Sequence, residues 1–421
     1  MIRLFNLNLD LYYKFYWIRV MCIGKLKLMR IVQDIDYSAL GFALLLFRIV
    51  FVDFCASLSM IGGSVHTIII LFYLLIWFLF ARGIIKNGVH VSNDGIMFFV
   101  CVLFLGVLSI PFSNSQYIWD VSLESFITFR CTSFFHAALY IPLIFTINDL
   151  SKLQKYLLIF ARIFMLFVVI NDFITISILD VKNDDDMMYS YGVVLLTCTL
   201  IHNFSKRKNI LDILLALVGV FSVFLSGTRG PLVCIAVCLC LSYISRITNK
   251  VSKILFIILL GLFVLMGGLT NIMSAMSFFF RKLGFNDIRL VQYHQDNMLM
   301  DSSGRDLIAS KVWNAIVENG IIGGGIGYDR VILDTYAHNI LLECYCNFGL
   351  LLGTVLIILI IVACYKFINS KEKDIASLGI ILISTILIKL LFSSSYLITF
   401  EFFLMLSLYF NNKKKSVLLK K

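Results

Sequence analysis

Apolar runs long enough to cross a bilayer recur along almost the whole chain. The chain has 421 residues, of which 60% are hydrophobic and only 14% are charged. A membrane-spanning helix needs about 20 predominantly apolar residues. The mean hydropathy of +0.94 lies far above that of a soluble domain. These features predict an all-α fold, a polytopic bundle of transmembrane helices.

The apolar runs predict about twelve spans, with uncertain ends. They are 37–57, 64–81, 95–112, 125–147, 155–180, 188–204, 208–226, 230–246, 252–274, 339–367, 375–392 and 395–411. The predicted organisation is a basic segment at 1–36, nine spans within 37–274, a large loop at 275–338, three spans within 339–411 and a basic tail at 412–421. The first 30 residues lack a clean signal-peptide core. They form either a basic interfacial segment or a stretch before a true start at Met21 or Met29.

Basic residues gather in alternate connections between the predicted spans. The five short connections of the opposite set hold only Lys182 and Arg229. By the positive-inside rule, the basic set and both termini are cytoplasmic. The loop at 275–338 then lies on the outer side. The net charge of +11 is explained by this orientation and does not indicate a nucleic-acid partner.

The large loop contains one predicted helix, at 305–319. Ile308, Val312 and Ile316 share one face of it, and Ser302 or Ser303 would supply a cap. A run of five glycines between 320 and 327 ends this helix. These glycines form either a hinge, a close backbone approach to a ligand, or a plain connector.

Three short polar stretches carry the candidate chemistry: 226–231 (SGTRGP), 303–306 (SGRD) and 337–339 (AHN). Arg229 lies in a tight outer turn, where it would bind a phosphate or anchor lipid headgroups. Arg305 opens the loop helix and would bind a diphosphate, or form a solvated ion pair. His338 would act as a general base, or simply end the following span.

Further polar residues near these stretches are candidate substrate contacts. Asn339 and Glu343 are four residues apart and share a helix face. Glu343 would orient substrate or partner an arginine, unless it only bonds Asn339. Arg289 and Lys311 add positive charge in the loop. Arg130 and His136 lie within a predicted span, where they would line a headgroup cavity.

Charged residues inside predicted spans include Arg48, Asp53, Arg162 and Asp172. Such residues usually face the interior of a bundle. Arg48 and Asp53 are five residues apart, a spacing that does not favour a pair between them. We therefore expect these charges to face the interior of the bundle, without a pair between Arg48 and Asp53.

In their order and spacing, the three stretches resemble the O-antigen polymerase and O-antigen ligase superfamily of bacterial envelope glycosyltransferases. The resembling part runs from about 209 to 367 and also includes the Glu-Asn and Gly-Ile-Gly stretch at 318–327. Gly320 stands where the family often has a proline. The N-terminal half resembles the family only as a generic helical bundle.

The resemblance implies a glycosyltransferase of the bacterial inner membrane, with its active site on the periplasmic face. Its donor would be an oligosaccharide on undecaprenyl diphosphate, held in a site bordered by membrane lipid. Arg229 and Arg305 would hold the diphosphate, and His338 would activate the acceptor hydroxyl for inverting transfer. No metal and no cofactor are implied.

Two enzymes of this superfamily fit the sequence. A polymerase would join repeat units, and a ligase would move the finished glycan to lipid A–core. The loop at 275–338 carries aromatic and polar residues that could shape a sugar acceptor, and it is short for recognising a large core. Both features favour the polymerase. A flippase for the lipid-linked oligosaccharide is a third hypothesis, which leaves the outer loop motifs unexplained. A chain-length regulator is a further candidate partner of the polymerase.

Overall fold

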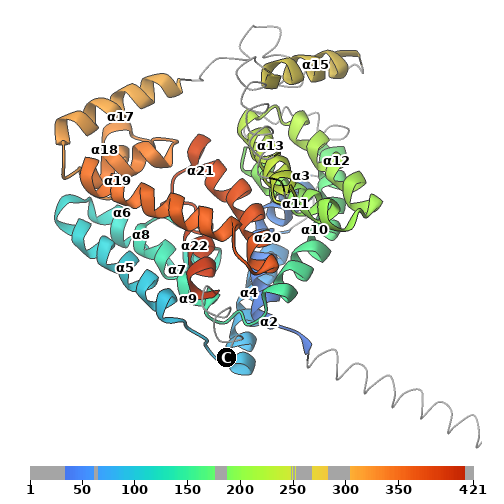
Figure 1. Cartoon of the computed structure of the whole chain (residues 1–421), viewed down its shortest axis with the longest axis horizontal. Helices are drawn as coiled ribbons and strands as arrows, with labels where there is room; N and C mark the ends of the chain where they lie inside the picture. Colours follow the sequence, from blue (N-terminus) through green and yellow to red (C-terminus); the bar gives the residue numbers. More distant parts are fainter. Residues whose placement is uncertain are drawn as a thin grey trace, which may run out of the picture.

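The structure is a computed structural model that describes residues 34–60, 65–175, 187–247, 249, 252, 268–282 and 304–412. Within these residues, every regular element is a helix (Figure 1). The helices up to residue 174 are α2 (Tyr37–Leu46), α3 (Arg48–Met60), α4 (His66–Asn87), α5 (Asn93–Ser109), η1 (Ile110–Phe112), α6 (Ser115–Trp119), α7 (Leu123–Ile127), α8 (Phe134–Ala138), α9 (Ile141–Ile144) and α10 (Leu150–Ile174).

The remaining described residues also form helices. They are α11 (Met187–Arg207), α12 (Ile210–Leu225), α13 (Arg229–Ile244), α15 (Gly268–Lys282), α17 (Arg305–Asn319), α18 (Tyr328–Leu333), α19 (Ile340–Ile368), α20 (Lys373–Leu382), the π-helix η4 (Ile383–Leu387), α21 (Ile388–Phe392) and α22 (Glu401–Asn412). Helix α15 runs across the boundary at 274 predicted between a span and the loop.

Five described segments are long and apolar enough to cross a membrane: α4, Asn93–Phe112, α10, α19 and Lys373–Phe392. Helices α2 and α3, bent by 56° at their junction, make a sixth if they form one span. The chain is therefore a helical protein with several helices able to span a membrane. The predicted span at 125–147 is divided among the short helices α7, α8 and α9. The figure of about twelve spans remains a prediction.

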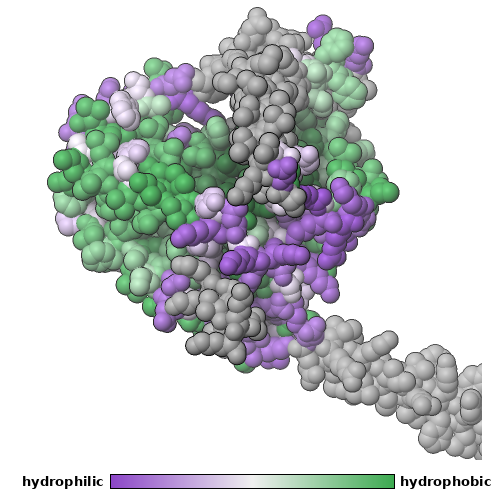
Figure 2. Space-filling view, viewed as in Figure 1, coloured by the Kyte–Doolittle hydropathy of each residue, from purple (hydrophilic) through white to green (hydrophobic). Residues whose placement is uncertain are grey.

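The outer faces of these helices are strongly apolar. On α5, Met97 and Phe104 are exposed, and on α19 so are Leu351 and Leu359. Figure 2 shows a broad hydrophobic area over α5 and α19, beside a band of hydrophilic side chains around α20. Exposed apolar area of this extent fits a helix surface that faces lipid.

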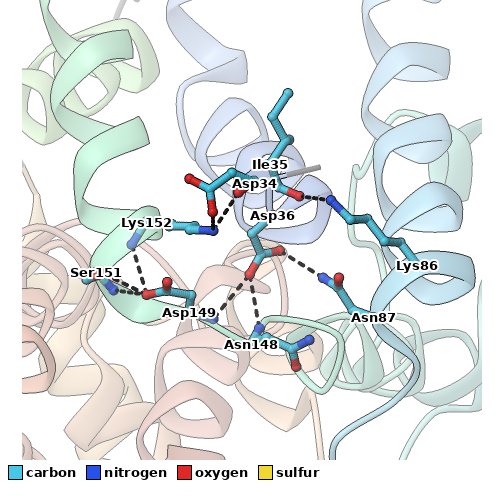
Figure 3. Close-up of polar contacts among 9 residues, drawn as sticks. All are labelled: Asp34, Ile35, Asp36, Lys86, Asn87, Asn148, Asp149, Ser151 and Lys152. Atoms are coloured by element: carbon cyan, nitrogen blue, oxygen red, sulfur yellow. Dashed lines mark hydrogen bonds and ion pairs between the residues drawn. The ribbon is translucent and has the colours of Figure 1, made fainter. Parts of the chain in front are cut away.

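Polar contacts tie together the connections that the charge pattern assigns to the cytoplasmic side. The buried carboxylate of Asp36 accepts bonds from four groups, three of which are drawn in Figure 3. One is the backbone amide of Ala39, so Asp36 caps α2. The others are the Asn87 side chain at the end of α4 and the amides of Asn148 and Asp149 before α10. One carboxylate thus fixes the ends of three helices.

Two of the charges inside the bundle pair with residues of other helices. Arg48 of α3 pairs with Glu401 of α22 at 2.6 Å, and its guanidinium lies 4.7 Å from the Phe400 ring. Arg162 of α10 makes two bonds to Asp212 of α12, at 2.8 and 3.1 Å. Each pair compensates a charge inside the bundle. Each pair also joins two helices that are distant in sequence.

The predicted loop helix is present as α17, and it ends at Gly320 as expected. Its start differs from the prediction, because Gly304 and not a serine occupies the cap position and no side chain caps the helix. Val312 and Ile316 are buried against Ala337 and Cys346. The predicted apolar face of α17 therefore docks the loop on the start of α19.

Helix α19 is broken at Gly349, which has φ 73° and ψ 177°. The glycine run fills the break. The amides of Gly324 and Gly325 donate to the carbonyls of Cys346 and Asn347, at 3.0 and 2.9 Å, and the amide of Leu350 donates to Gly320 at 3.2 Å. Backbone groups freed by a break within a span need such partners. The close approach of the glycine run is thus to the chain's own backbone.

Candidate functional site

The turn before α13 places Arg229 at a helix start. Gly227 takes φ 65°, which favours glycine. The Ser190 hydroxyl of α11 donates to the Ser226 hydroxyl at 2.7 Å, and Ser226 donates to the Val223 carbonyl. Gly230 lies so close to α11 that a Cβ there would come within 2.1 Å of the Tyr191 hydroxyl. Gly230, the neighbour of Arg229 in the chain, therefore packs tightly against Tyr191.

His338 lies in the short connection between α18 and α19, with φ 54°. Its ring is half-buried and lies 4.1 Å from the Tyr336 ring. Nδ1 is buried and has no hydrogen-bond partner among the described residues. Burial and the nearby positive charge of Arg305 both lower the pKa of His338. A neutral imidazole at neutral pH can accept a proton, as a general base must.

Arg305 is the first residue of α17, and its side chain is exposed. The docking of α17 on α19 brings it within electrostatic range of His338 and Tyr336. Arg305 also interacts electrostatically with Tyr191, the residue against which Gly230 packs. Tyr191 thus relates the stretch at 226–231, through Gly230, to Arg305.

Asn339 caps α19. Its side-chain oxygen accepts bonds from the amides of Leu341 and Leu342, and its amide nitrogen donates to the Leu391 carbonyl at 3.1 Å. No hydrogen bond joins the side chains of Asn339 and Glu343, which was one of the alternatives given for Glu343 from the sequence. Both polar ends of the Asn339 side chain are therefore occupied by the protein itself.

Glu343 is fully buried, and the Ser395 hydroxyl links its carboxylate to an arginine. Ser395 donates to one carboxylate oxygen of Glu343, and the amide of Tyr396 donates to the other at 3.2 Å. Arg330 in turn donates to the Ser395 hydroxyl at 3.0 Å. The neighbouring Asp329 accepts a bond from the Ala337 amide at 3.0 Å, and burial raises the pKa of its carboxyl. This network anchors the segment that carries His338.

The other candidate contacts are dispersed. Lys311 is exposed on α17, and Arg130 is exposed between α7 and α8. Arg289 lies outside the described residues. His136, which was expected to line a cavity with Arg130, is buried and its Nε2 lies 2.8 Å from the Tyr140 hydroxyl. These residues do not converge on His338 in the described part of the chain.

Sequence reasoning did not select Arg330, Asp329, Tyr336 or Ser395. The signals were present, because the Tyr-Asp-Arg triplet follows the glycine run directly and three consecutive serines occupy a very short outer connection. Two polar residues before His338, Asp334 and Thr335, complete this polar segment. Their shared location only becomes apparent once α18 and the serines are placed side by side.

Two cavities are lined by residues close to His338 in the chain. A polar, open cavity of about 450 Å³ is lined by Gln116, Tyr117, Asp120, Cys131, Thr132, Arg330, Asp334, Thr335, Tyr336 and Ile398. An apolar groove of about 420 Å³ runs between α5, α19 and α22, and Ile340 and Cys344 line it near the start of α19. Among the described residues, no three His, Cys, Asp or Glu side chains converge as metal ligands would.

The fold and this site together define a helical membrane protein whose polar site lies at the ends of its helices. Residues 214–358 match the sequence model of a family described as O-antigen ligase. The resemblance to the O-antigen ligase and polymerase superfamily is confirmed for this segment, about a third of the chain. The family's members are glycosyltransferase-like enzymes, and the match does not distinguish polymerase from ligase. No curated protein matches the chain.

Proposed function

We propose that this protein is an O-antigen polymerase, which joins oligosaccharide repeat units carried on undecaprenyl diphosphate at the outer face of the bacterial inner membrane. One observation carries the proposal: the matched segment contains Arg229, Arg305 and His338. The packing of Gly230 on Tyr191 and the electrostatic effect of Arg305 on His338 support a common site.

Each candidate residue has a defined role in the proposed transfer. His338 takes the proton from the attacking hydroxyl of the acceptor sugar. A bond forms between that oxygen and the anomeric carbon of the donor, while the bond from that carbon to the phosphate oxygen breaks with inversion. Undecaprenyl diphosphate leaves, and Arg229 and Arg305 stabilise the charge that develops on it.

The apolar groove offers a place for the carrier's hydrocarbon chain. Phe98, Val102 and Leu105 of α5 line one side, and Leu356 and Ile360 of α19 line the other. Its lining is almost entirely apolar, which suits an isoprenoid. Under the predicted orientation, its outer end at Ile340 lies two residues from His338.

The ligase is the second candidate, because the matched family is described as O-antigen ligase. It would use the same donor and the same three residues with lipid A–core as the acceptor. The two activities leave different products in a deletion strain. Core carrying a single repeat unit would support the polymerase. Bare core, with polymer accumulating on the carrier, would support the ligase.

The site assignment is tested with Arg229→Ala, Arg305→Ala and His338→Ala in the complemented strain. Each should lower product at least about a hundredfold, the usual cost of removing one transition-state contact. Arg207→Ala, at the opposite end of α11, is the control and should retain product. Western blots of membranes establish equal amounts of protein. Full product from all three variants would refute the site.

A further inference from the structure

The polar cavity beside His338 has no role in the function proposed so far. It lies between α6, the segment before α8, and the residues from Arg330 to Tyr336. Its volume of about 450 Å³ falls within the roughly 300–1,000 Å³ of small-molecule pockets. Tyr336 belongs both to the cavity lining and to the ring contact with His338. A molecule in this cavity would therefore contact Tyr336, whose ring lies against that of the candidate base.

The charge of the cavity argues against a phosphate. Asp120 and Asp334 contribute two carboxylates, and Arg330 is the one cation in the lining. That cation is already engaged, because it donates to Ser395 and lies 5.5 Å from the Tyr117 ring. A diphosphate would meet net negative charge here, so the cavity differs in chemistry from the surroundings of Arg229 and Arg305.

Several polar groups of the cavity are available for hydrogen bonds. In the part of the chain that the structure describes, the side chains of Gln116, Asp120 and Asp334 make no hydrogen bond to other protein groups. Thr132 is engaged, because its hydroxyl donates to the Asp120 carbonyl at 2.6 Å. Ionised carboxylates bind hydroxyl donors more strongly than neutral acceptors do.

Two aromatic rings complete the lining, Tyr117 and Tyr336. Tyr117 packs closely against Gly327, where a Cβ would come within 2.5 Å of its ring. A tyrosine offers an apolar face and a polar tip. Carboxylates that accept from hydroxyl groups, together with aromatic faces that cover C–H groups, are the combination that binds a neutral sugar.

We propose that this cavity binds the terminal sugar of the acceptor oligosaccharide and presents its hydroxyl to His338. The inference rests on the proposed glycosyl transfer and adds to it the site of the acceptor. The acceptor is assigned here because the base must contact the attacking hydroxyl. The donor's diphosphate belongs with the arginines.

The test uses the full chain in lipid nanodiscs, with the lipid-linked repeat unit as donor. The acceptor probe is the water-soluble repeat-unit oligosaccharide, released from its carrier by mild acid. Asp120→Asn and Asp334→Asn should each raise the KM for this probe about tenfold, the effect of losing one charged hydrogen bond, with kcat little changed. Asparagine tolerates the positive φ of Asp334, 56°, so the backbone is preserved.

Asp306→Asn is the matched control, because Asp306 is an exposed carboxylate on α17 that does not line the cavity. It should leave the KM for the probe unchanged. Saturation-transfer NMR of the probe adds a readout that does not need activity, and the signal should weaken in the two cavity variants alone.

The outcomes separate this inference from the proposed function. A wild-type protein that makes no glycosidic bond refutes the function itself. A wild-type protein that is active, with an unchanged KM and unchanged NMR signal in both cavity variants, refutes the cavity as the acceptor site. An equal rise in KM for Asp306→Asn also refutes it, because the effect would then be general electrostatics.

Discussion

Gly323 and Gly349 lie backbone to backbone, so that a Cβ on Gly323 would come within 2.3 Å of the amide nitrogen of Gly349. One residue belongs to the outer loop and the other to the break in α19. Their contact places the carbonyls of Cys346 and Asn347 opposite the amides that they accept from. The loop and the broken helix thus form one structural unit. His338 belongs to it, two residues before α19 begins.

Gly323→Ala and Gly349→Ala should therefore detach the loop from α19. Each adds a Cβ within 2.3 Å of backbone atoms that have no room to move, at a residue with positive φ. We expect each variant to lose more stability than the roughly 1–3 kcal/mol that such a positive-φ conformation alone costs a residue with a Cβ. The measurement is the thermal unfolding midpoint of the purified protein in detergent, together with product in membranes.

Gly320→Ala separates the cost of a positive φ from the cost of a steric clash between the added Cβ and the backbone. Gly320 also has positive φ, 61°, but no atom lies within 4 Å of its added Cβ. This variant should show only the strain and should retain product. If all three alanines lower the unfolding midpoint equally, the contact between the loop and the helix break does not stabilise the protein.

The sequence predicted the features that depend on local pattern. The helix at 305–319 and its end at Gly320 follow from the spacing of Ile308, Val312 and Ile316 and from the glycine itself. The interior placement of charges such as Arg48 follows from the cost of leaving them in lipid. Each of these depends on residues within a few turns of each other, or on the membrane alone.

Features that depend on distant contacts could not be predicted. Nothing in the sequence near Glu343 shows that Ser395, 52 residues later, meets its carboxylate. The break at Gly349 lies inside an apolar run, so periodicity gave one continuous span there. The use of Asn339 as a cap competes with the substrate role that its position suggested. Such choices are decided by tertiary packing.

The contact between Gly230 and Tyr191 predicts a rescue. Gly230→Ala should displace the Tyr191 ring and disturb Arg229, because the added Cβ would lie 2.1 Å from the tyrosine hydroxyl. Tyr191→Phe removes that hydroxyl, and the next ring atom lies 3.2 Å away. Product should fall about tenfold or more in Gly230→Ala and recover in the double variant, since the two changes are coupled.

Tyr191→Phe alone serves as the control for this rescue. If it lacks product, the hydroxyl has a direct role and the double variant cannot recover. If Gly230→Ala retains full product, the close packing beside Arg229 does not position the arginine. Lipopolysaccharide gels with equal membrane protein provide the measurement in each case.

The surroundings of His338 predict a pH dependence. Burial and Arg305 lower its pKa, so the imidazole stays neutral to a lower pH than a free histidine, and activity should fall only on acidification below its ordinary pKa of about 6.5. Arg305→Gln removes the positive neighbour, so the pKa should rise and the acid limb should move to higher pH. The measurement is the pH profile of kcat/KM in nanodiscs. An acid limb that stays in place would show that His338 is not the titrating base.

The apolar groove predicts that bulk added on one face of α5 blocks the donor. Cys101 is exposed and lines the groove, whereas the adjacent Val100 is exposed on the same helix and does not line it. Cys101→Trp should fill part of the 420 Å³ and raise the KM for the lipid-linked donor about tenfold, while Val100→Trp should not. Both tryptophans face the lipid side of the bundle, so both variants should fold. Equal donor KM values in the two variants would place the isoprenoid elsewhere. With a donor truncated to a short isoprenoid, the two variants should show the same donor KM, because the short chain would no longer reach the filled part of the groove.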